Sequence, residues 1–452
     1  MLKKNDLIIA QITDYTNEGN GVARYDDIVV FVPNAAVGDE AQIRIVKVLS
    51  SYCYGRLESL IFPSPDRVAP RCPAAGRCGG CDFQHISYEA EKRRKRKFVQ
   101  DAFSRIGRFD IEVNELKSCE KSEGYRNKAQ YPVSTDKDGH LIFGFYAKNS
   151  HRIVPCSDCR LEPDIFNEIA SFTVSEAERL GITAYSEETG SGILRHIYLR
   201  RAEVTGQIML CLVVADPSSP ALRKLAEKAK DEFSAISTVL ININRKKTNV
   251  ILGPENIVVS GKGYIDDLLC GVRVEISPHS FYQVNHDGAQ ELYSIAKESL
   301  ELTGDDDLLD LYCGTGSIGL SMADSVRSLI GVEIVPQAVE NARKNAEYMG
   351  LSNTRFICAD AGKAATELAR EGIRPTAVVL DPPRKGCDEP TLSSIIRMSP
   401  DRISMISCNP VTAARDCRYL CDNGYRLVFV QPFDMFPRTR HCESIAILER
   451  KN

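Results

Sequence analysis

Two residues at expected strand ends, Cys408 and Glu443, have side chains suited to covalent catalysis. Cys408 stands in SCNPVT, where a strand should end and a helix begin. The N-terminus of a helix favours the thiolate, so we expect a lowered pKa for this thiol. Glu443 opens the last expected strand and should return to the same edge of the sheet. The pair predicts a thiolate nucleophile with a carboxylate base beside it.

A glycine-rich run, DLYCGTGSIGL, indicates a cofactor loop between an expected strand and an expected helix. Its Gly314, Gly316 and Gly319 have G-x-G-x-x-G spacing, which lets the backbone turn sharply and approach a ligand. Glu333, at the end of the next strand, can accept hydrogen bonds from ribose hydroxyls, and Asp360, at the end of the third, can meet the adenine. A dinucleotide and S-adenosylmethionine both suit these residues.

Asp381, in DPPRKG at the end of the fourth expected strand, should face the same crevice. If the cofactor is the methyl donor S-adenosylmethionine, the thiolate and the carboxylate suit methylation of carbon 5 of uracil. Addition of the thiolate to carbon 6 makes carbon 5 nucleophilic, and a base then removes the carbon 5 proton so that the thiolate can leave. Asp381 could hydrogen-bond the uracil edge or the cofactor amine.

These residues can act together only if one sheet brings the ends of their strands to the same edge. The sequence of the C-terminal part of the chain predicts such a sheet. Strand-like and helical segments alternate after residue 280, which is typical of a doubly wound parallel sheet with its ligands at the carboxyl ends of the strands. A last strand, 443–449, follows without a helix and should pair antiparallel with its predecessor. The other expected strands are 308–312, 328–334, 354–358, 377–381, 402–408 and 425–430.

The preceding residues predict two further domains. Short strand-like runs before residue 60 favour a small OB-like β-barrel, and mixed strands and helices favour an α+β domain after it. We therefore expect a barrel at 1–60, a central α+β domain at 61–275 and a catalytic α/β domain at 276–452. The basic helix expected near 88–106 is a candidate for packing on the catalytic domain.

A cysteine-rich loop lies inside the central region. Cys72, Cys78 and Cys81 form a C-x5-C-x2-C arrangement with small residues between them, which is typical of a metal centre. A fourth ligand has to come from elsewhere, and Cys156 and Cys159 are the candidates. The spacing alone leaves zinc and a 4Fe-4S cluster both open.

An unbroken run of six basic residues spans 92–97 inside an expected helix. Such a run can neutralise phosphates and makes binding salt-dependent, so we interpret it as an RNA-binding surface. An enzyme that modifies carbon 5 must also take the base out of its stack. Phe281, Tyr282 and Phe436 are candidates for stacking on that base, although each suits core packing as well.

Length and charge narrow the class of protein. A chain of 452 residues predicts two to four domains, and a net charge of -4 excludes a globally basic nucleic-acid binder. No apolar run of 18 residues and no signal peptide are evident. We therefore expect a cytoplasmic protein with reduced thiols and no membrane partner, and no obligate protein partner is evident.

The chain resembles the RNA (uracil-5-)-methyltransferase family in motifs that follow one another in the family's order: SFYQVN, DLYCGTG, GVEIVPQAVENARKNA, LDPPRKG, SCNPVT and a final HCE. The resemblance covers most of the chain, including a TRAM-like barrel and a cysteine cluster. It implies a Rossmann-like class I methyltransferase domain and S-adenosylmethionine as the cofactor. One departure is Met405, where the family usually has a tyrosine, but the reactive SCN segment is intact.

The resemblance also implies roles for single residues. Cys408 is the nucleophile and Glu443 the base, and four residues match the family's cofactor-contacting positions: Gln283, Tyr312, Glu333 and Asp381. The iron-sulfur branch of the family implies a 4Fe-4S cluster on Cys72, Cys78, Cys81 and Cys159, the last of which aligns best with that branch's fourth cysteine. That branch acts chiefly on large-subunit ribosomal RNA, so 23S rRNA is the preferred partner and T-loop uridine of tRNA the alternative.

Other classes of protein explain the motifs less well. An N-methyltransferase would carry an aromatic residue after DPP and would have no use for Cys408, and a cytosine-5 RNA methyltransferase would place its cysteine where Arg384 stands. An NAD-linked oxidoreductase gives the terminal HCE segment no role. A non-catalytic RNA-binding scaffold is disfavoured because Cys408 and Glu443 are both present.

Overall fold

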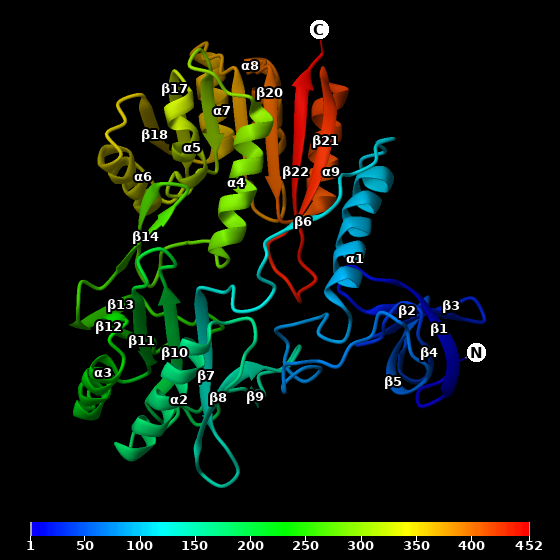
Figure 1. Ribbon diagram of the computed structural model, residues 1–452, viewed down its shortest axis with the longest axis vertical. Helices are drawn as coiled ribbons and strands as arrows, with labels where there is room; N and C mark the ends of the chain where they lie inside the picture. The colour runs from blue at the N-terminus through cyan, green and yellow to red at the C-terminus, as the bar shows by residue number, and fades with distance from the viewer. Residues whose placement is uncertain (1, 452) are drawn as a thin grey trace.

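The computed structural model describes residues 2–451. It has three parts, which Figure 1 shows as a blue barrel at the lower right, a green sheet at the lower left and a sheet at the top that ends in red strands. No helix in this part of the chain is long and apolar enough to cross a membrane.

The N-terminal part is a closed barrel with the strand order β1-β2-β3-β5-β4. Alternate side chains, such as Ala23, Val30, Ile43 and Cys53, are buried in its core, as expected for strands with one face inward. The strands are β1 (Leu7–Tyr15), β2 (Gly21–Tyr25), β3 (Ile28–Val32), β4 (Glu40–Val48) and β5 (Tyr52–Phe62).

The central part is a seven-stranded sheet with the order β13-β12-β11-β10-β7-β8-β9. Two helices, α2 (Asp164–Arg179) and α3 (Pro220–Glu232), bury one face of it. The other face, which includes Tyr198 and Cys211, shares a core with the catalytic part. The strands are β7 (Lys128–Thr135), β8 (Leu141–Tyr146), β9 (Ile153–Pro155), β10 (Leu194–Arg201), β11 (Ile208–Val214), β12 (Ile236–Ile243) and β13 (Glu255–Ser260).

The catalytic part is an eight-stranded sheet with the order β18-β17-β16-β19-β20-β22-β21-β6. Its first five strands are parallel, as the alternation of strands and helices predicts. The strands are β16 (Asp307–Leu311), β17 (Ser328–Glu333), β18 (Thr354–Cys358), β19 (Ala377–Leu380), β20 (Arg402–Ser407), β21 (Tyr425–Asp434), β22 (Glu443–Arg450) and β6 (Lys117–Ser118).

The last strand does more than pair with its predecessor. β22 lies between β20 and β21 and is antiparallel to both, so it brings the end of the chain beside the fifth parallel strand. At the outer edge β6, from the central region of the sequence, pairs in parallel with β21.

Helices and one hairpin complete the catalytic part. The hairpin of β14 (Ile265–Leu269) and β15 (Val272–Ile276) precedes α4 and packs with it in the shared core. The helices are α4 (His286–Leu300), α5 (Ser317–Met322), the 3-10 turn Ala323–Ser325, α6 (Pro336–Tyr348), α7 (Ala361–Arg370), α8 (Glu389–Met398) and α9 (Pro410–Asp422).

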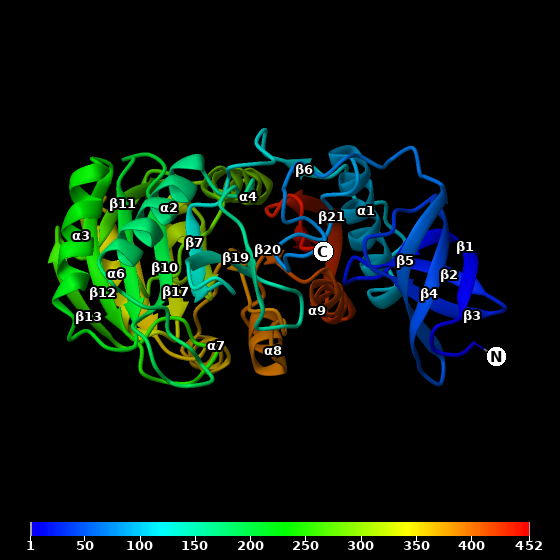
Figure 2. The same ribbon diagram turned by 90° about the horizontal axis from the view of Figure 1, so that it is seen from below.

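Helix α1 (Tyr88–Asp101), continued by a π-helical turn at Ala102–Ile106, connects the barrel to the catalytic part. Ser87 caps its start by accepting a hydrogen bond from the Ala90 N–H. Val99 and Phe103 are buried in the catalytic core. Figure 2 shows α1 between the barrel and the pair β21 and α9, so this basic helix packs on the catalytic sheet.

Candidate active site

The sheet register places Cys408 and Glu443 opposite each other. Ser407, the last residue of β20, pairs with Ser444 on β22, so Cys408, which directly follows β20, continues this register opposite Glu443. Glu443 is also the first residue of its strand and is only 7% exposed. Cys408 is half-buried and lies just before α9, whose N-cap Asn409 accepts a hydrogen bond from the Val411 N–H at 3.2 Å.

The expectation of a lowered thiol pKa is wrong for the protein without ligands. Burial raises the pKa of Cys408, and the carboxyl groups of Glu443 and Asp381 raise it further. The guanidinium of Arg384 opposes them and lowers the pKa of the thiol. Burial and the two carboxyl groups therefore favour the protonated thiol.

Three carboxyl groups near the strand ends have raised pKa values. Burial raises the pKa of Glu443 to about 8, with a further contribution from Asp381. Burial also raises the pKa of Asp381 to about 7. It raises that of Asp310 to about 8, although the Gly319 N–H donates to this carboxylate at 2.9 Å. A cation bound among these groups would favour their ionised forms.

The glycine-rich loop has the geometry that its spacing predicts. Gly314 and Gly316 have φ of 56° and 82°, in the left-handed region that favours glycine. A Cβ at Gly319 would lie 2.7 Å from the Asp310 carboxylate, so this position also excludes a side chain. The non-glycine Tyr312 has φ of 68°, which marks the strand end as a sharp turn held by its surroundings.

Glu333 and Asp360 both hold backbone at the strand ends. The Glu333 carboxylate accepts from the N–H groups of Gly314 at 3.1 Å and Val335 at 2.8 Å. This fixes it against the glycine-rich loop. Asp360 caps α7 by accepting from the Lys363 N–H at 3.2 Å. Both carboxylates therefore already accept from backbone N–H groups, and Glu333 holds the glycine-rich loop itself.

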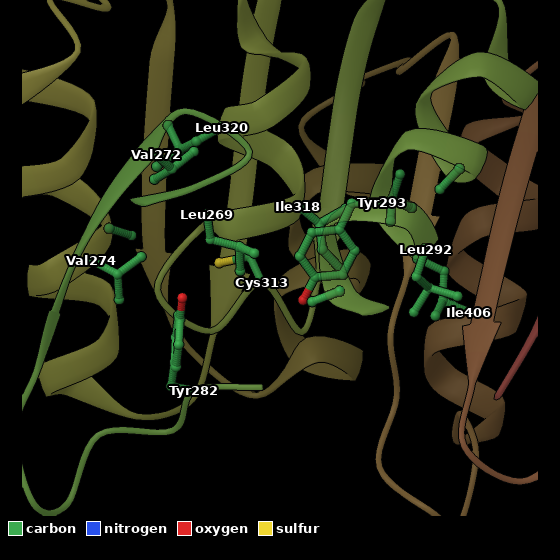
Figure 3. Close-up of a cluster of buried hydrophobic side chains, with 14 of the residues drawn as sticks. Leu269, Val272, Val274, Tyr282, Leu292, Tyr293, Cys313, Ile318, Leu320 and Ile406 are labelled. Atoms are coloured by element: carbon green, nitrogen blue, oxygen red, sulfur yellow. The ribbon is translucent and has the colours of Figure 1, made fainter. Parts of the chain in front are cut away.

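Gln283 lies in the segment between β15 and α4. Asn127 donates to the Gln283 carbonyl at 2.8 Å, and the nearby Gln283 side chain lowers the pKa of Tyr293. Burial and then the charge of Asp381 raise the pKa of Tyr293. Tyr293, on α4, is therefore a neighbour of both Gln283 and Asp381. Figure 3 shows Tyr293 in the buried cluster that also contains Cys313.

Sequence reasoning missed the role of Arg384 as a neighbour of the reactive pair. Its charge lowers the pKa of both Cys408 and Glu443, and one guanidinium nitrogen lies 3.4 Å from Nδ1 of His441. Asn409 donates to its backbone carbonyl at 2.9 Å. The sequence feature that could have identified Arg384 is its position in DPPRKG, three residues after Asp381.

A second missed residue is Lys128, the first residue of β7. It is half-buried, and burial, followed by the charges of Arg200 and Arg126, lowers its pKa to about 8. No acidic group in residues 2–451 contributes to this shift. A cation held among cations in this way is suited to an anionic ligand, and only the structure brings Arg200 beside it.

The aromatic candidates differ in exposure. Phe281 is 75% exposed, whereas Tyr282 is buried and donates to Asp267 at 2.8 Å. Phe436 is half-buried, and its ring packs edge-on against His441. Phe281 alone of these three presents most of its ring to solvent.

The interpretation of the basic run as an RNA-binding surface is wrong for Arg94 and Lys95, which are buried, and stays a prediction for the more exposed members. Lys95 is fully buried between Glu91 and Asp434, at 2.7 Å from each carboxylate. Arg94 is also buried and donates to the carbonyls of Thr16 and Arg440. The other four basic side chains each have an acidic partner: Lys92 with Glu89, Arg93 with Asp66, Arg96 with Glu112, and Lys97 with Asp101. The run joins the barrel to the catalytic part.

The cysteine loop lies beside β8 and β9. Cys72, Cys78, Cys156 and Cys159 pack around Ala74 and Val154. Hydrogen bonding with the Cys156 thiol lowers the pKa of Cys72 to about 6 and also lowers that of Cys159. Cys81 accepts from the Gln84 side chain at 3.7 Å. Within residues 2–451, however, no group of three or more His, Cys, Asp or Glu side chains is arranged to hold a metal ion.

Comparison with known families matches nearly the whole chain. The tRNA (uracil-5-)-methyltransferase family model matches residues 87–451, and the TRAM domain model matches residues 7–57. An uncharacterized RNA methyltransferase of Halalkalibacterium halodurans is 41% identical over 452 residues, which cover 100% of this chain and 98% of that protein. One from Listeria monocytogenes is 40% identical over 452 residues, covering 99% and 98%.

A solved structure is similar along its whole length. The tRNA (uracil-54, C5)-methyltransferase of Pyrococcus abyssi, crystallised in complex with S-adenosyl-L-homocysteine, is 27% identical with a TM-score of 0.78. The similarity covers 97% of this chain and 99% of that one. The chain therefore belongs to the tRNA (uracil-5-)-methyltransferase family, carries an N-terminal TRAM domain and is an RNA methyltransferase.

Proposed function

We propose that the protein transfers a methyl group from S-adenosylmethionine to carbon 5 of a uridine in RNA through a covalent adduct on Cys408. The observation that carries this proposal is the register of β20 and β22, which sets Glu443 opposite Cys408. A nucleophile and a base on adjacent antiparallel strands can act on carbons 6 and 5 of one ring, because these carbons are bonded to each other.

The reaction then has two stages. The Cys408 thiolate adds to carbon 6, and the electron pair of the 5,6 double bond moves into the ring as an enolate. Carbon 5 of this enolate attacks the methyl group of the donor, and the bond between that methyl and the donor's sulfur breaks, which leaves S-adenosylhomocysteine. Glu443 then accepts the carbon 5 proton. The electrons of that C–H bond restore the double bond, and the sulfur–carbon bond breaks to release the thiolate.

The charges of the site suit a cationic methyl donor. S-adenosylmethionine carries a sulfonium and an ammonium group, and Asp310, Asp381 and Glu443 are buried carboxyl groups, with pKa values raised mainly by that burial, that a cation could ionise. We assign the cofactor to the glycine-rich loop with Gly314 and Gly316, and to Gln283, Tyr312, Glu333, Asp360 and Asp381. Its cation would lower the carboxyl pKa values, so that Glu443 becomes ionised when the methyl donor is bound.

The RNA is proposed to reach the site along Lys128 and Phe281. Lys128 offers a half-buried charge without an acidic partner in residues 2–451, and the exposed ring of Phe281 precedes Gln283 by two residues. A charge for phosphate beside a ring for stacking is the combination that holds an unstacked base.

We propose a uridine of 23S ribosomal RNA as the target, because the cysteine loop resembles that of the iron-sulfur branch. The second candidate is the T-loop uridine of tRNA, which the similarity to the tRNA (uracil-54, C5)-methyltransferase of Pyrococcus abyssi favours. Methylation of the two RNAs in competition, followed by mapping of 5-methyluridine, separates the candidates.

We also propose that Cys72, Cys78, Cys81 and Cys159 hold a 4Fe-4S cluster. Four thiolates at about 2.3 Å from one zinc ion nearly touch one another, whereas a cluster binds each thiolate on a different iron and keeps them further apart. Cys72, Cys78 and Cys159 lie around Ala74 and Val154, and Cys81 follows Cys78 by three residues, so the resemblance of this loop to the iron-sulfur branch supports the cluster. Protein purified without oxygen should be brown and contain four irons; colourless protein with stoichiometric zinc would contradict the assignment.

Trapping tests the main proposal. Purified protein is incubated with S-adenosylmethionine and RNA that contains 5-fluorouridine, then analysed by denaturing gel and mass spectrometry. Fluorine cannot leave as a proton does, so a methylated adduct on Cys408 should persist. It should be absent in Cys408→Ala. No adduct with either ribosomal RNA or tRNA would contradict uracil-5 chemistry.

A further inference from the structure

The loop that leads into Glu443 is held from outside its own sheet. This base loop, residues 435–442, connects β21 to β22 and ends directly before Glu443. In Figure 1 it hangs below the red strands, toward the blue and cyan segments that follow the barrel. Its conformation therefore depends on contacts with parts of the chain that lie more than 300 residues earlier in the sequence.

Two consecutive residues clamp the middle of the base loop. The N–H groups of Asp82 and Phe83 both donate to the Arg438 carbonyl, at 2.9 and 3.1 Å. The Asp82 carboxylate accepts from the Arg440 N–H at 3.1 Å. Asp82 immediately follows Cys81, so the end of the cysteine loop is attached directly to the loop that carries the base.

Other early residues bind three further backbone groups of the base loop. Glu91 accepts from the Arg438 N–H at 2.7 Å, and Lys95 donates to the Phe436 carbonyl at 3.1 Å. The Tyr125 hydroxyl donates to the Pro437 carbonyl at 3.0 Å. Each bond fixes backbone rather than a side chain, so the path of the loop is set by these partners.

The backbone of the base loop is strained. Arg438 has φ of 68°, in the left-handed region that a residue with a Cβ adopts at a free-energy cost and only where its surroundings hold it there. Arg438 is also the residue that Asp82, Phe83 and Glu91 bind through its N–H and carbonyl groups. These hydrogen bonds therefore hold Arg438 in a strained backbone conformation that the loop would otherwise leave.

We propose that Asp82 and Tyr125 are positioning residues for Glu443, acting through the base loop. This inference rests on the proposed function, because it assigns them to the step in which Glu443 removes the carbon 5 proton. Addition of the thiolate and methyl transfer use groups on β20 and on the cofactor side. Displacement of the loop therefore slows release of the adduct more than its formation.

Single-turnover experiments on unmodified RNA separate the two steps. Formation is followed as methyl label in the covalent protein–RNA band, and release as loss of that band. Asp82→Ala and Tyr125→Phe should form the adduct within about twofold of the wild-type rate but release it about tenfold more slowly, which is about 1.4 kcal/mol in barrier. A covalent band should then accumulate on natural RNA.

Two control variants distinguish positioning from general damage. Asp82→Asn keeps an oxygen that can accept from the Arg440 N–H, so it should restore most of the release rate. Asp66→Ala removes the surface ion pair with Arg93 on α1 without touching the base loop, and should behave as the wild type. Tyr125→Phe removes a single hydroxyl, so it remains informative if Asp82→Ala fails to fold.

The outcomes have separate meanings. Equal slowing of formation and release in Asp82→Ala and Tyr125→Phe, or wild-type rates in both, overturns the positioning role. Failure of the wild-type protein to form any adduct, even with 5-fluorouridine RNA, instead overturns the proposed function. Thiol and iron content of Asp82→Ala, measured in parallel, shows whether a loss arises through the neighbouring Cys81.

Discussion

The basic side chains of α1 and those near the active site carry the same charge but differ in where their partners lie. On α1, Lys95 is buried against Glu91 and Asp434, and the exposed members of the run have acidic neighbours within the chain. Near the active site, Lys128 has two arginines as its charged neighbours, and Arg384 faces the reactive thiol and carboxyl. The density of charge in the sequence therefore does not show which cations are available to RNA.

The strongest test of this contrast is removal of the buried charge on α1. Lys95→Met removes the buried cation that Glu91 and Asp434 share, so the free energy of unfolding should fall by about 3–5 kcal/mol. Urea denaturation measures it. RNA affinity of the folded fraction should stay unchanged. A stable variant with weakened RNA binding would show that this lysine reaches RNA after all.

A smaller but step-specific effect is expected at Arg384. Its charge lowers the pKa of Cys408 and Glu443. Arg384→Met should therefore raise both pKa values, and activity should begin to increase only at a higher pH than in the wild type. At neutral pH the rate of adduct formation should fall about tenfold for each pH unit of that difference. The measurement is the rate of trapping by 5-fluorouridine RNA between pH 6 and 9.

A matched substitution sharpens the Arg384 experiment. Arg384→Lys keeps the positive charge and should retain most of the wild-type pH profile, while the backbone carbonyl that binds Asn409 is present in both variants. If Met and Lys at this position give the same profile, the charge of Arg384 does not control the titration of the reactive pair.

Lys128 should contribute to RNA affinity in a way that depends on pH. Its lowered pKa of about 8 means that it is charged below that pH and loses its proton as pH rises through it, so RNA binding should weaken above pH 8. Lys128→Gln should remove this dependence and reduce the salt slope of binding by about 0.7 to 0.9. Lys128→Arg should keep the slope but lose the change with pH, because arginine does not titrate in this range.

The sequence predicted the catalytic sheet well because its alternation of strands and helices is local. It also indicated that Glu443 returns beside Cys408. It did not predict that β22 lies between β20 and β21, because the order of strands in a sheet depends on contacts that no local pattern records. The same limit explains why the predicted direction of the thiol pKa shift of Cys408 and the predicted role of the buried members of the basic run are wrong.

The thiol pKa of Cys408 and the role of the basic run depend on groups distant in sequence. A helix N-terminus is visible in SCNPVT, but Glu443 and Asp381, which raise the thiol pKa, become its neighbours only through folding. Likewise Asp434, the partner of Lys95, lies 339 residues further along the chain. Charge effects are set by distance and burial, so they could not be read from local motifs.

The smallest effect is expected from the exposed members of the α1 run. Arg93 is 63% exposed and Lys97 51% exposed, and their partners Asp66 and Asp101 are also accessible to water. Such pairs stabilise a fold by less than about 1 kcal/mol each. Arg93→Gln combined with Lys97→Gln should therefore change thermal stability little and leave the salt slope of RNA binding within error of the wild-type value. A slope reduced by about 1.4, the value for two phosphate contacts on single-stranded RNA, would mean that RNA displaces both acidic partners and that α1 has a second role besides joining the barrel to the catalytic sheet.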